Sequence, residues 1–246
     1  MCVQFFSNSE EGMKKIWNKI KRKWMKLRLQ PIRVFCFHQV SDVFDSSTMW
    51  KCDWTQTDQF KNNIEILQKT YTFISLEEAR IHLLNDIFRV RKYAVLTCDD
   101  GWASLANIVP WIVEKRIPLM LFVNPEYFLG LGARENGMDK LLKRDEISRM
   151  VSLGKPFVQI ASHGWNHQLC TEQSMDVFQT NVVRSMEVIN EMNGDTRYFA
   201  YPCGCHTQEL DLFLQKKKII PVYCDGIQNY NNANVIHREP LDGLII

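Results

Sequence analysis

The sequence predicts an α/β fold with a mostly parallel sheet, built as one domain behind an N-terminal helix. Short apolar runs of strand length alternate with segments of helical periodicity along residues 31–246, as is typical of parallel sheets with crossover helices. Two of the runs end in acidic or imidazole side chains, which is expected where strand ends open onto a ligand site. The chain has 246 residues and is 46% hydrophobic, so it can bury a full core.

Residues 1–30 predict a basic amphipathic helix. Apolar side chains recur there at helical spacing, and eight bases lie within residues 14–28 with no acid among them. A peripheral membrane contact through residues 13–28 is one interpretation. The alternative is that the tryptophans of this helix pack onto the domain. The remainder has 22 bases against 28 acids, which does not suggest nucleic-acid binding.

The domain, residues 31–246, is predicted to begin after Pro31 with a strand that ends at His38. Helix signals follow in order: Ser75 and Glu78 form a capping-box pattern, Pro110 is expected to kink or interrupt its helix, and Asn193-Gly194 ends a long helix. Strands are predicted at 32–37, 94–96, 119–123, 157–160, 198–201, 219–223 and 235–236, and helices at 55–70, 75–84, 102–115, 145–153, 174–193 and 208–217.

Two adjacent carboxylates, Asp99 and Asp100, end the apolar run 94–96 and precede a glycine. Neighbouring side chains that leave a strand end point in different directions. One carboxylate can therefore bind a metal ion while the other meets the reacting centre. The alternative is an ordinary Asp-Gly turn.

Two histidines, His163 and His167, follow the run 157–160 at a spacing of four. Residues i and i+4 share a face of a helical turn. Two imidazoles and one carboxylate make a suitable site for zinc or another divalent cation with positions left open. A structural histidine pair is the alternative.

These segments resemble motifs of the polysaccharide deacetylases, also known as carbohydrate esterase family four or the NodB homology domain. Residues 97–101 are similar to T-F-D-D-G, His163 to His167 to H-[ST]-x-x-H, and Tyr201 to Gly204 to Y-P-[YF]-G. The resemblance implies a distorted (β/α) barrel of about seven parallel strands and an enzyme that hydrolyses N- or O-acetyl groups on sugars.

By the same resemblance, Asp99 would be the general base, and Asp100, His163 and His167 would hold the cation. Zinc is the first choice of metal, with cobalt, nickel or manganese as alternatives. The backbone N–H of Cys203 would help to bind the oxyanion. Gly164 stands where the family has Ser or Thr, so the histidine loop is expected to be looser or differently bonded.

Three further predictions concern the late segment and the substrate. Arg238 is expected to orient the base, because Ala200 occupies the position where many members of the family have an arginine. His237 is the candidate general acid, with a purely structural strand histidine as the alternative. Contacts to the substrate are predicted for His38, Tyr201 and Trp165.

The leading hypothesis is a metal-dependent hydrolase that removes acetyl groups from an acetylated sugar or polysaccharide precursor. The alternative is a catalytically weak or inactive carbohydrate-binding protein on the same fold, although such a protein has no need of Asp99. An unrelated glycosidase would need a second carboxylate partner for Asp99.

The eight cysteines are scattered without C-x-x-C spacing, which favours a reducing compartment. Neither a secretory leader nor a run of transmembrane length is visible. The sequence therefore favours a cytoplasmic location, with membrane association as a further hypothesis.

Overall fold

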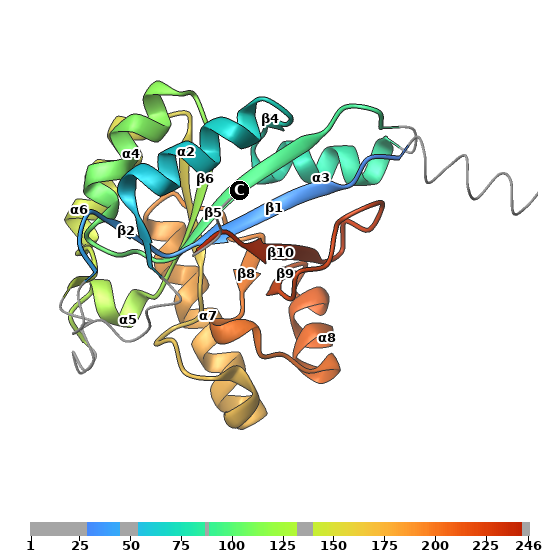
Figure 1. Ribbon diagram of the computed structural model, residues 1–246. Coiled ribbons are helices and arrows are strands. Elements are labelled where there is room, and N and C mark those ends of the chain that lie inside the picture. Colours follow the sequence, from blue (N-terminus) through green and yellow to red (C-terminus); the bar gives the residue numbers. More distant parts are fainter. Residues whose placement is uncertain (1–28, 45–53, 87–88, 132–139, 243–246) are drawn as a thin grey trace, which may run out of the picture.

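Seven parallel strands close into a distorted barrel, which confirms the predicted fold (Figure 1). The computed structural model describes residues 29–44, 54–86, 89–131 and 140–242. Pairing of β1 with β5 closes the ring, and these strands lie side by side through the centre of the molecule. In ring order the strands are β1 (Ile32–Phe37), β10 (Ile236–Pro240), β9 (Ile220–Cys224), β8 (Tyr198–Ala200), β7 (Val158–Ser162), β6 (Leu119–Val123) and β5 (Tyr93–Asp100).

Helices cover the outside of the barrel, as crossover connections between parallel strands require. The predicted capping box is present, since the Ser75 and Glu78 side chains each accept a hydrogen bond from the other's backbone N–H. The helix that contains Pro110 is unbroken, so this proline does not interrupt it. The main helices are α2 (Thr57–Gln68), α3 (Leu76–Asn85), α4 (Leu105–Glu114), α6 (Arg144–Gly154), α7 (Met175–Glu191) and α8 (Gln208–Lys216).

Several short elements were not expected from the sequence. They are too brief to show hydrophobic periodicity, and most of them lie in connections between the longer elements. They are β2 (Gln39–Ser41), β3 (Trp54–Gln56), β4 (Thr72–Phe73), α5 (Pro125–Phe128), η3 (Cys170–Glu172) and η4 (Pro202–Gly204).

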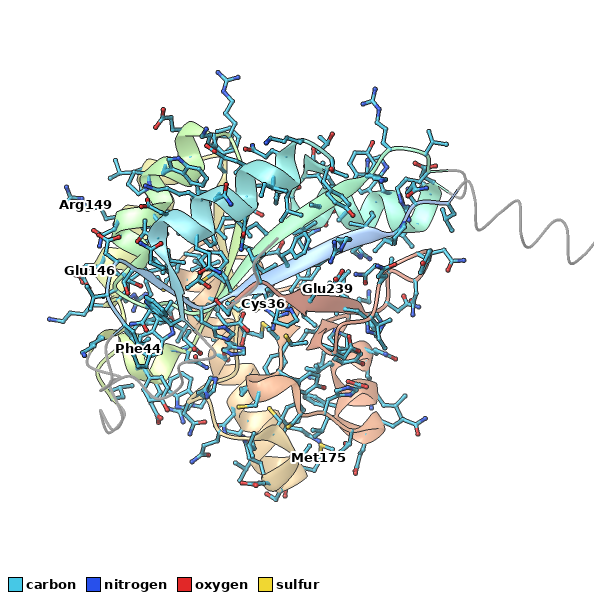
Figure 2. All side chains as sticks on the ribbon, in the orientation of Figure 1. Cys36, Phe44, Glu146, Arg149, Met175 and Glu239 are labelled. Carbon is cyan, nitrogen blue, oxygen red and sulfur yellow. The ribbon has the colours of Figure 1, made fainter. Side chains whose placement is uncertain are left out.

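Alternate strand residues point into the barrel and out toward the helices. Val34, Val95 and Val222 belong to one apolar cluster drawn from most of the strands, the pattern of a barrel interior. Their strand neighbours pack in separate clusters with helical residues. Cys36, two residues after Val34, lies near the middle of the molecule in Figure 2. This alternation decides which polar side chains at the strand ends face the interior.

The predicted N-terminal helix falls almost entirely on residues 1–28, which lie outside the described residues. Its outcome therefore stays a prediction. Within the described ranges, no helix combines the length and apolar character needed to cross a membrane.

Candidate active site

The carboxyl ends of β5 and β7 bring together the first group of predicted residues. Asp100 Oδ1 lies 3.6 Å from His163 Nε2 and 3.3 Å from His167 Nε2. That oxygen is buried and has no hydrogen-bond partner in the described part of the chain, and the three ligand atoms lie within 4.8 Å of one another. Buried polar atoms are rarely left unpaired, so this donor set fits a divalent cation.

His163 is oriented and kept neutral by its surroundings. Its Nδ1 donates to the Ala200 carbonyl at 3.0 Å, so its Nε2 is left to face Asp100, the usual arrangement of a ligating histidine. Burial is the main reason that the pKa of His163 falls to about 4, even though Asp99 and Asp100 favour the charged form. The ring is therefore available as a neutral ligand at neutral pH.

Two serines brace the histidine loop in place of the side chain that Gly164 lacks. The Gly164 N–H donates to Ser162 Oγ at 3.1 Å, and Ser185 Oγ donates to the Gly164 carbonyl at 3.2 Å. The two hydroxyls lie 2.6 Å apart. The loop is thus differently bonded, one of the two outcomes expected from the sequence.

Three of the predicted site residues have left-handed backbone conformations. The φ angles are 68° at Asp100, 55° at His167 and 54° at Cys203. Such angles are uncommon outside glycine and concentrate at functional sites. The exposed Cys203 belongs to η4. This element lies beside the histidine loop, as shown by the 3.4 Å that would separate a Cβ added at Gly164 from Pro202 Cγ.

Arg238 binds the second carboxylate, that of Asp99, through both terminal nitrogens of its guanidinium. Its Nη1 and Nη2 donate to Asp99 Oδ1 and Oδ2 at 2.6 and 2.8 Å, and both side chains are almost fully buried. Burial alone would raise the pKa of Asp99. The charge of Arg238, supported by the nearby His163, outweighs it and holds that pKa well below its usual range. Asp99 is therefore ionised at neutral pH.

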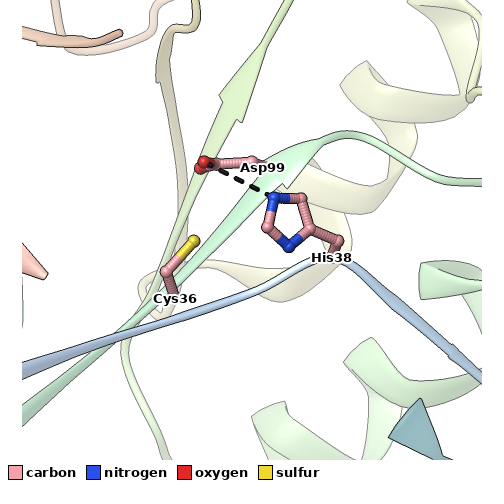
Figure 3. Close-up of side chains that lie close together, drawn as sticks. All are labelled: Cys36, His38 and Asp99. Carbon is pink, nitrogen blue, oxygen red and sulfur yellow. Dashed lines mark ion pairs between the residues drawn. The ribbon is translucent and has the colours of Figure 1, made fainter. Parts of the chain in front are cut away.

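His38 approaches Asp99 from the end of β1 (Figure 3). Its Nε2 lies 3.9 Å from Asp99 Oδ2, and its Nδ1 lies 2.7 Å from Asp242 Oδ2. Burial opposes the charged form, but the hydrogen bond and charge of Asp242, with smaller contributions from Asp99 and Asp100, raise the pKa of His38 to about 10. His38 thus carries its proton at neutral pH.

Two contributing residues were missed from the sequence. Asp242 also accepts the backbone N–H of His38 at 3.2 Å, and Trp102 Nε1 donates to Asp100 Oδ2, the oxygen that does not face the two histidines, at 3.3 Å. Trp102 directly follows the Asp-Asp-Gly segment, a signal that was available. Asp242 offered only an Asp-Gly pair after the last strand.

Three predicted residues are not brought to this cluster. Because Arg238 points inward, its strand neighbour His237 points outward, with Nδ1 2.7 Å from Asp225 Oδ2. Tyr201 is 1% exposed and its hydroxyl donates to Asp211 at 3.0 Å. Trp165 is 5% exposed, donates to Glu126 at 3.0 Å and lies beneath Arg184. The structure thus gives each of the three side chains a partner outside the Asp99 and Asp100 cluster, and the roles predicted for them stay predictions.

The parallel barrel, with carboxylates and imidazoles gathered at its carboxyl end, defines a (β/α)-barrel protein with a candidate metal-hydrolase centre. A family model described as polysaccharide deacetylase matches residues 89–219, more than half of the chain. The chain therefore belongs to the polysaccharide deacetylase family and is a carbohydrate deacetylase, a hydrolase.

Solved structures share this fold. IcaB from Ammonifex degensii is 20% identical with a TM-score of 0.72, covering 87% of this chain and 93% of its own. Streptococcus pyogenes deacetylase PplD, in complex with acetate, is 18% identical with a TM-score of 0.71 and the same coverage, 87% and 93%. A de-N-acetylase from Aggregatibacter actinomycetemcomitans is 16% identical with a TM-score of 0.67, covering 87% and 95%. No curated protein matches the chain.

Proposed function

We propose that this chain is a metal-dependent hydrolase that removes an acetyl group from an acetylated sugar or glycan precursor. The observation that carries the proposal is the buried Asp100 Oδ1, which has no hydrogen-bond partner among the described residues and faces two imidazole nitrogens beside a second carboxylate. Asp100, His163 and His167 would hold the cation, and their nitrogen and oxygen donors suit zinc, with cobalt, nickel or manganese as alternatives. When bound, the cation supplies positive charge that acidifies water and polarises the acetyl carbonyl.

Asp99 is proposed as the general base. It lies next to the cation ligands without belonging to them, and the paired hydrogen bonds from Arg238 fix both of its oxygens. An ionised carboxylate in that place can accept the proton of the attacking water. Arg238 acts as a positioning residue, because it holds the base rather than the reacting atoms.

His38 is proposed as the general acid in place of His237. It lies on the Asp99 side of the site and retains its proton through Asp242, so it can protonate the leaving nitrogen or oxygen. The Cys203 N–H would donate to the developing oxyanion, a contribution of about 2.7–4 kcal/mol where such donors have been removed. The position of η4 beside the histidine loop supports this role.

The test is acetate release from a panel of acetylated glycans, with and without a chelator, by wild type and by Asp99→Asn. We expect release to require the cation and to fall by about 10²–10⁴-fold in the variant. Release that is independent of both would overturn the mechanism. A folded protein that binds acetylated glycans and releases no acetate would instead support the alternative of a carbohydrate-binding protein.

We also propose a cytoplasmic location with peripheral membrane contact through residues 13–28. The supporting observation is in the sequence, where eight bases and two tryptophans occur without an acid, a composition that suits an anionic surface. Co-sedimentation with anionic liposomes should be lost when residues 1–29 are deleted. Unchanged co-sedimentation would remove this proposal.

A further inference from the structure

Two thiols lie at the inner face of the barrel beside the base, and the deacetylation scheme uses neither. Cys36 on β1 and Cys224 on β9 are both free cysteines. Their side chains lie close enough to interact, which raises the pKa of Cys36 and lowers the pKa of Cys224. The sulfur of Cys36, a ring nitrogen of His38 and a carboxylate oxygen of Asp99 lie within 4.8 Å of one another. Figure 3 shows these three side chains converging.

We propose that Cys36, His38 and Asp99 form a second cation site, to which the neighbouring Cys224 adds a second sulfur, and that this site takes a thiophilic divalent cation such as zinc. Two sulfurs, one imidazole nitrogen and one carboxylate oxygen are a familiar four-ligand set for zinc, and thiolates select it over harder cations. This site is separate from the Asp100, His163 and His167 cluster, with which it shares no residue.

The ligands of the second site are held by partners outside it. Asp242 binds Nδ1 of His38 at 2.7 Å, which leaves Nε2 facing Asp99. Arg238 fixes the Asp99 carboxylate with two hydrogen bonds. Carboxylate–histidine pairs and hydrogen-bonded carboxylates of this kind are the usual supports of metal ligands. These partners fix the orientation of the His38 ring and of the Asp99 carboxylate.

The two thiols can also offset the repulsion between a bound cation and the positive charge of the buried Arg238. A dication that enters beside a guanidinium would be repelled if it added net charge. Ligation by both sulfurs releases two thiol protons, which offset the two charges of the cation. His38 must give up its proton as well. Binding is therefore expected to tighten as the pH rises.

Occupation of the second site would engage both Asp99 and His38. If these are the base and the acid, as proposed above, one equivalent of zinc supports acetate release and a second equivalent inhibits it. Manganese prefers oxygen ligands and should not inhibit. The inhibition rests on the proposed function, whereas binding at the thiols does not.

The test is a titration of the full-length, reduced, metal-stripped protein with Co²⁺, followed by absorption spectroscopy. Sulfur ligation gives an intense thiolate-to-cobalt charge-transfer band in the near ultraviolet, which carboxylate and imidazole ligands do not give. We expect two bound equivalents, one of them with this band. The double variant Cys36→Ala/Cys224→Ala should bind one equivalent without the band, and inhibition by zinc should need at least about tenfold more metal.

Two further variants separate this inference from the proposed function. Cys98→Ala removes another buried thiol, one residue before Asp99 on the outward face of β5, and should keep both equivalents and the band. Asp100→Asn should lose the other equivalent and keep the band. If Asp100→Asn leaves both equivalents in place, the proposed catalytic cluster fails while the thiol site stands.

The proposal is overturned if the folded wild type binds cobalt without sulfur ligation. It is equally overturned if the band survives in the double variant. Circular dichroism confirms folding, and Cys36→Ser/Cys224→Ser replaces the alanine pair if the latter unfolds.

Discussion

The candidate site has two halves that differ in how the chain builds them. The cation half, Asp100 with His163 and His167, comes from two local segments whose residue types predict metal binding. The acid–base half joins partners far apart in the sequence: Arg238 and Asp99 are 139 residues apart, and His38 and Asp242 are 204 apart. This half forms around β1, which lies between β10 and β5 and closes the barrel by pairing with β5.

The halves also differ in charge. In the cation half a buried carboxylate oxygen has no hydrogen-bond partner within residues 29–44, 54–86, 89–131 and 140–242. In the acid–base half each carboxylate is paired with a cationic side chain. Changes in the first half should therefore alter metal binding and turnover with little effect on stability. Changes in the second should alter stability and pH dependence.

The largest expected effect is that of Asp100→Asn. Asparagine tolerates the left-handed backbone, so the fold should persist while a cation ligand is lost. A cation that stabilises the transition state by several kcal/mol predicts a fall in turnover of about 10³-fold or more. Metal content and acetate release are the measurements. Asp99→Asn is the control, since it should lose turnover and keep the cation that Asp100, His163 and His167 hold. An active Asp100→Asn that still binds that cation would contradict the assignment.

Arg238→Met should cause the largest loss of stability. It leaves the Asp99 charge buried and unpaired, which costs about 3–5 kcal/mol in comparable cases. The depressed pKa of Asp99 contributes stability that is present above its unfolded pKa of about 4 and is lost as the pH falls through the folded pKa. The deficit of the variant should therefore shrink below about pH 4.

Urea unfolding at neutral and acidic pH measures the effect of Arg238→Met. Arg33→Met is the matched control, because Arg33 pairs with Glu239 on the same β1–β10 seam but remains partly exposed. Its loss should cost no more than about 1 kcal/mol. Equal losses in the two variants would contradict the contrast between buried and exposed pairs.

Asp242→Asn should shift the pH dependence of turnover. Without that charge, the pKa of His38 falls from about 10 toward its ordinary value. The stability that this raised pKa contributes is complete below about pH 6.5 and is lost as the pH rises through the folded pKa. We expect turnover at about pH 8.5 to drop by about 10–100-fold, with little change near pH 6.

The pH–rate profile and an NMR titration of the His38 ring would check the Asp242→Asn prediction. Asp225→Asn is the matched control, since Asp225 pairs with His237 outside the barrel, and it should leave the profile in place. A basic limb that stays unchanged in Asp242→Asn would remove His38 as the acid.

The smallest expected effect is that of His237→Asn. This histidine points away from Asp99, so acetate release should change by less than about twofold, in the range of a surface substitution. A loss comparable to that of His38→Asn would break the comparison and restore His237 as the general acid.

Local runs and residue types were enough to predict a mostly parallel α/β sheet and to bring Asp99, Asp100, His163 and His167 into one site. The closed barrel followed from the resemblance to the polysaccharide deacetylases. Whether a strand side chain points into the barrel or outward could be predicted only if the orientation of one residue on that strand was already known. Once Arg238 is known to bind Asp99, His237 must point outward, because neighbouring strand residues alternate. In the same way, the Ala200 carbonyl accepts a hydrogen bond from His163, and the next residue, Tyr201, is buried outside the site. The pairing of His38 with Asp242 depends on ring closure, for which no local pattern exists.

The left-handed backbone of Asp100, His167 and Cys203 implies a conflict between activity and robustness. Each such residue costs about 1–3 kcal/mol relative to a relaxed conformation, and natural proteins commonly accept such costs where they serve function. A descendant of this chain released from catalysis would be free to place glycine or asparagine at these positions. A gain in thermal stability from such substitutions would indicate that the protein had lost its catalytic activity.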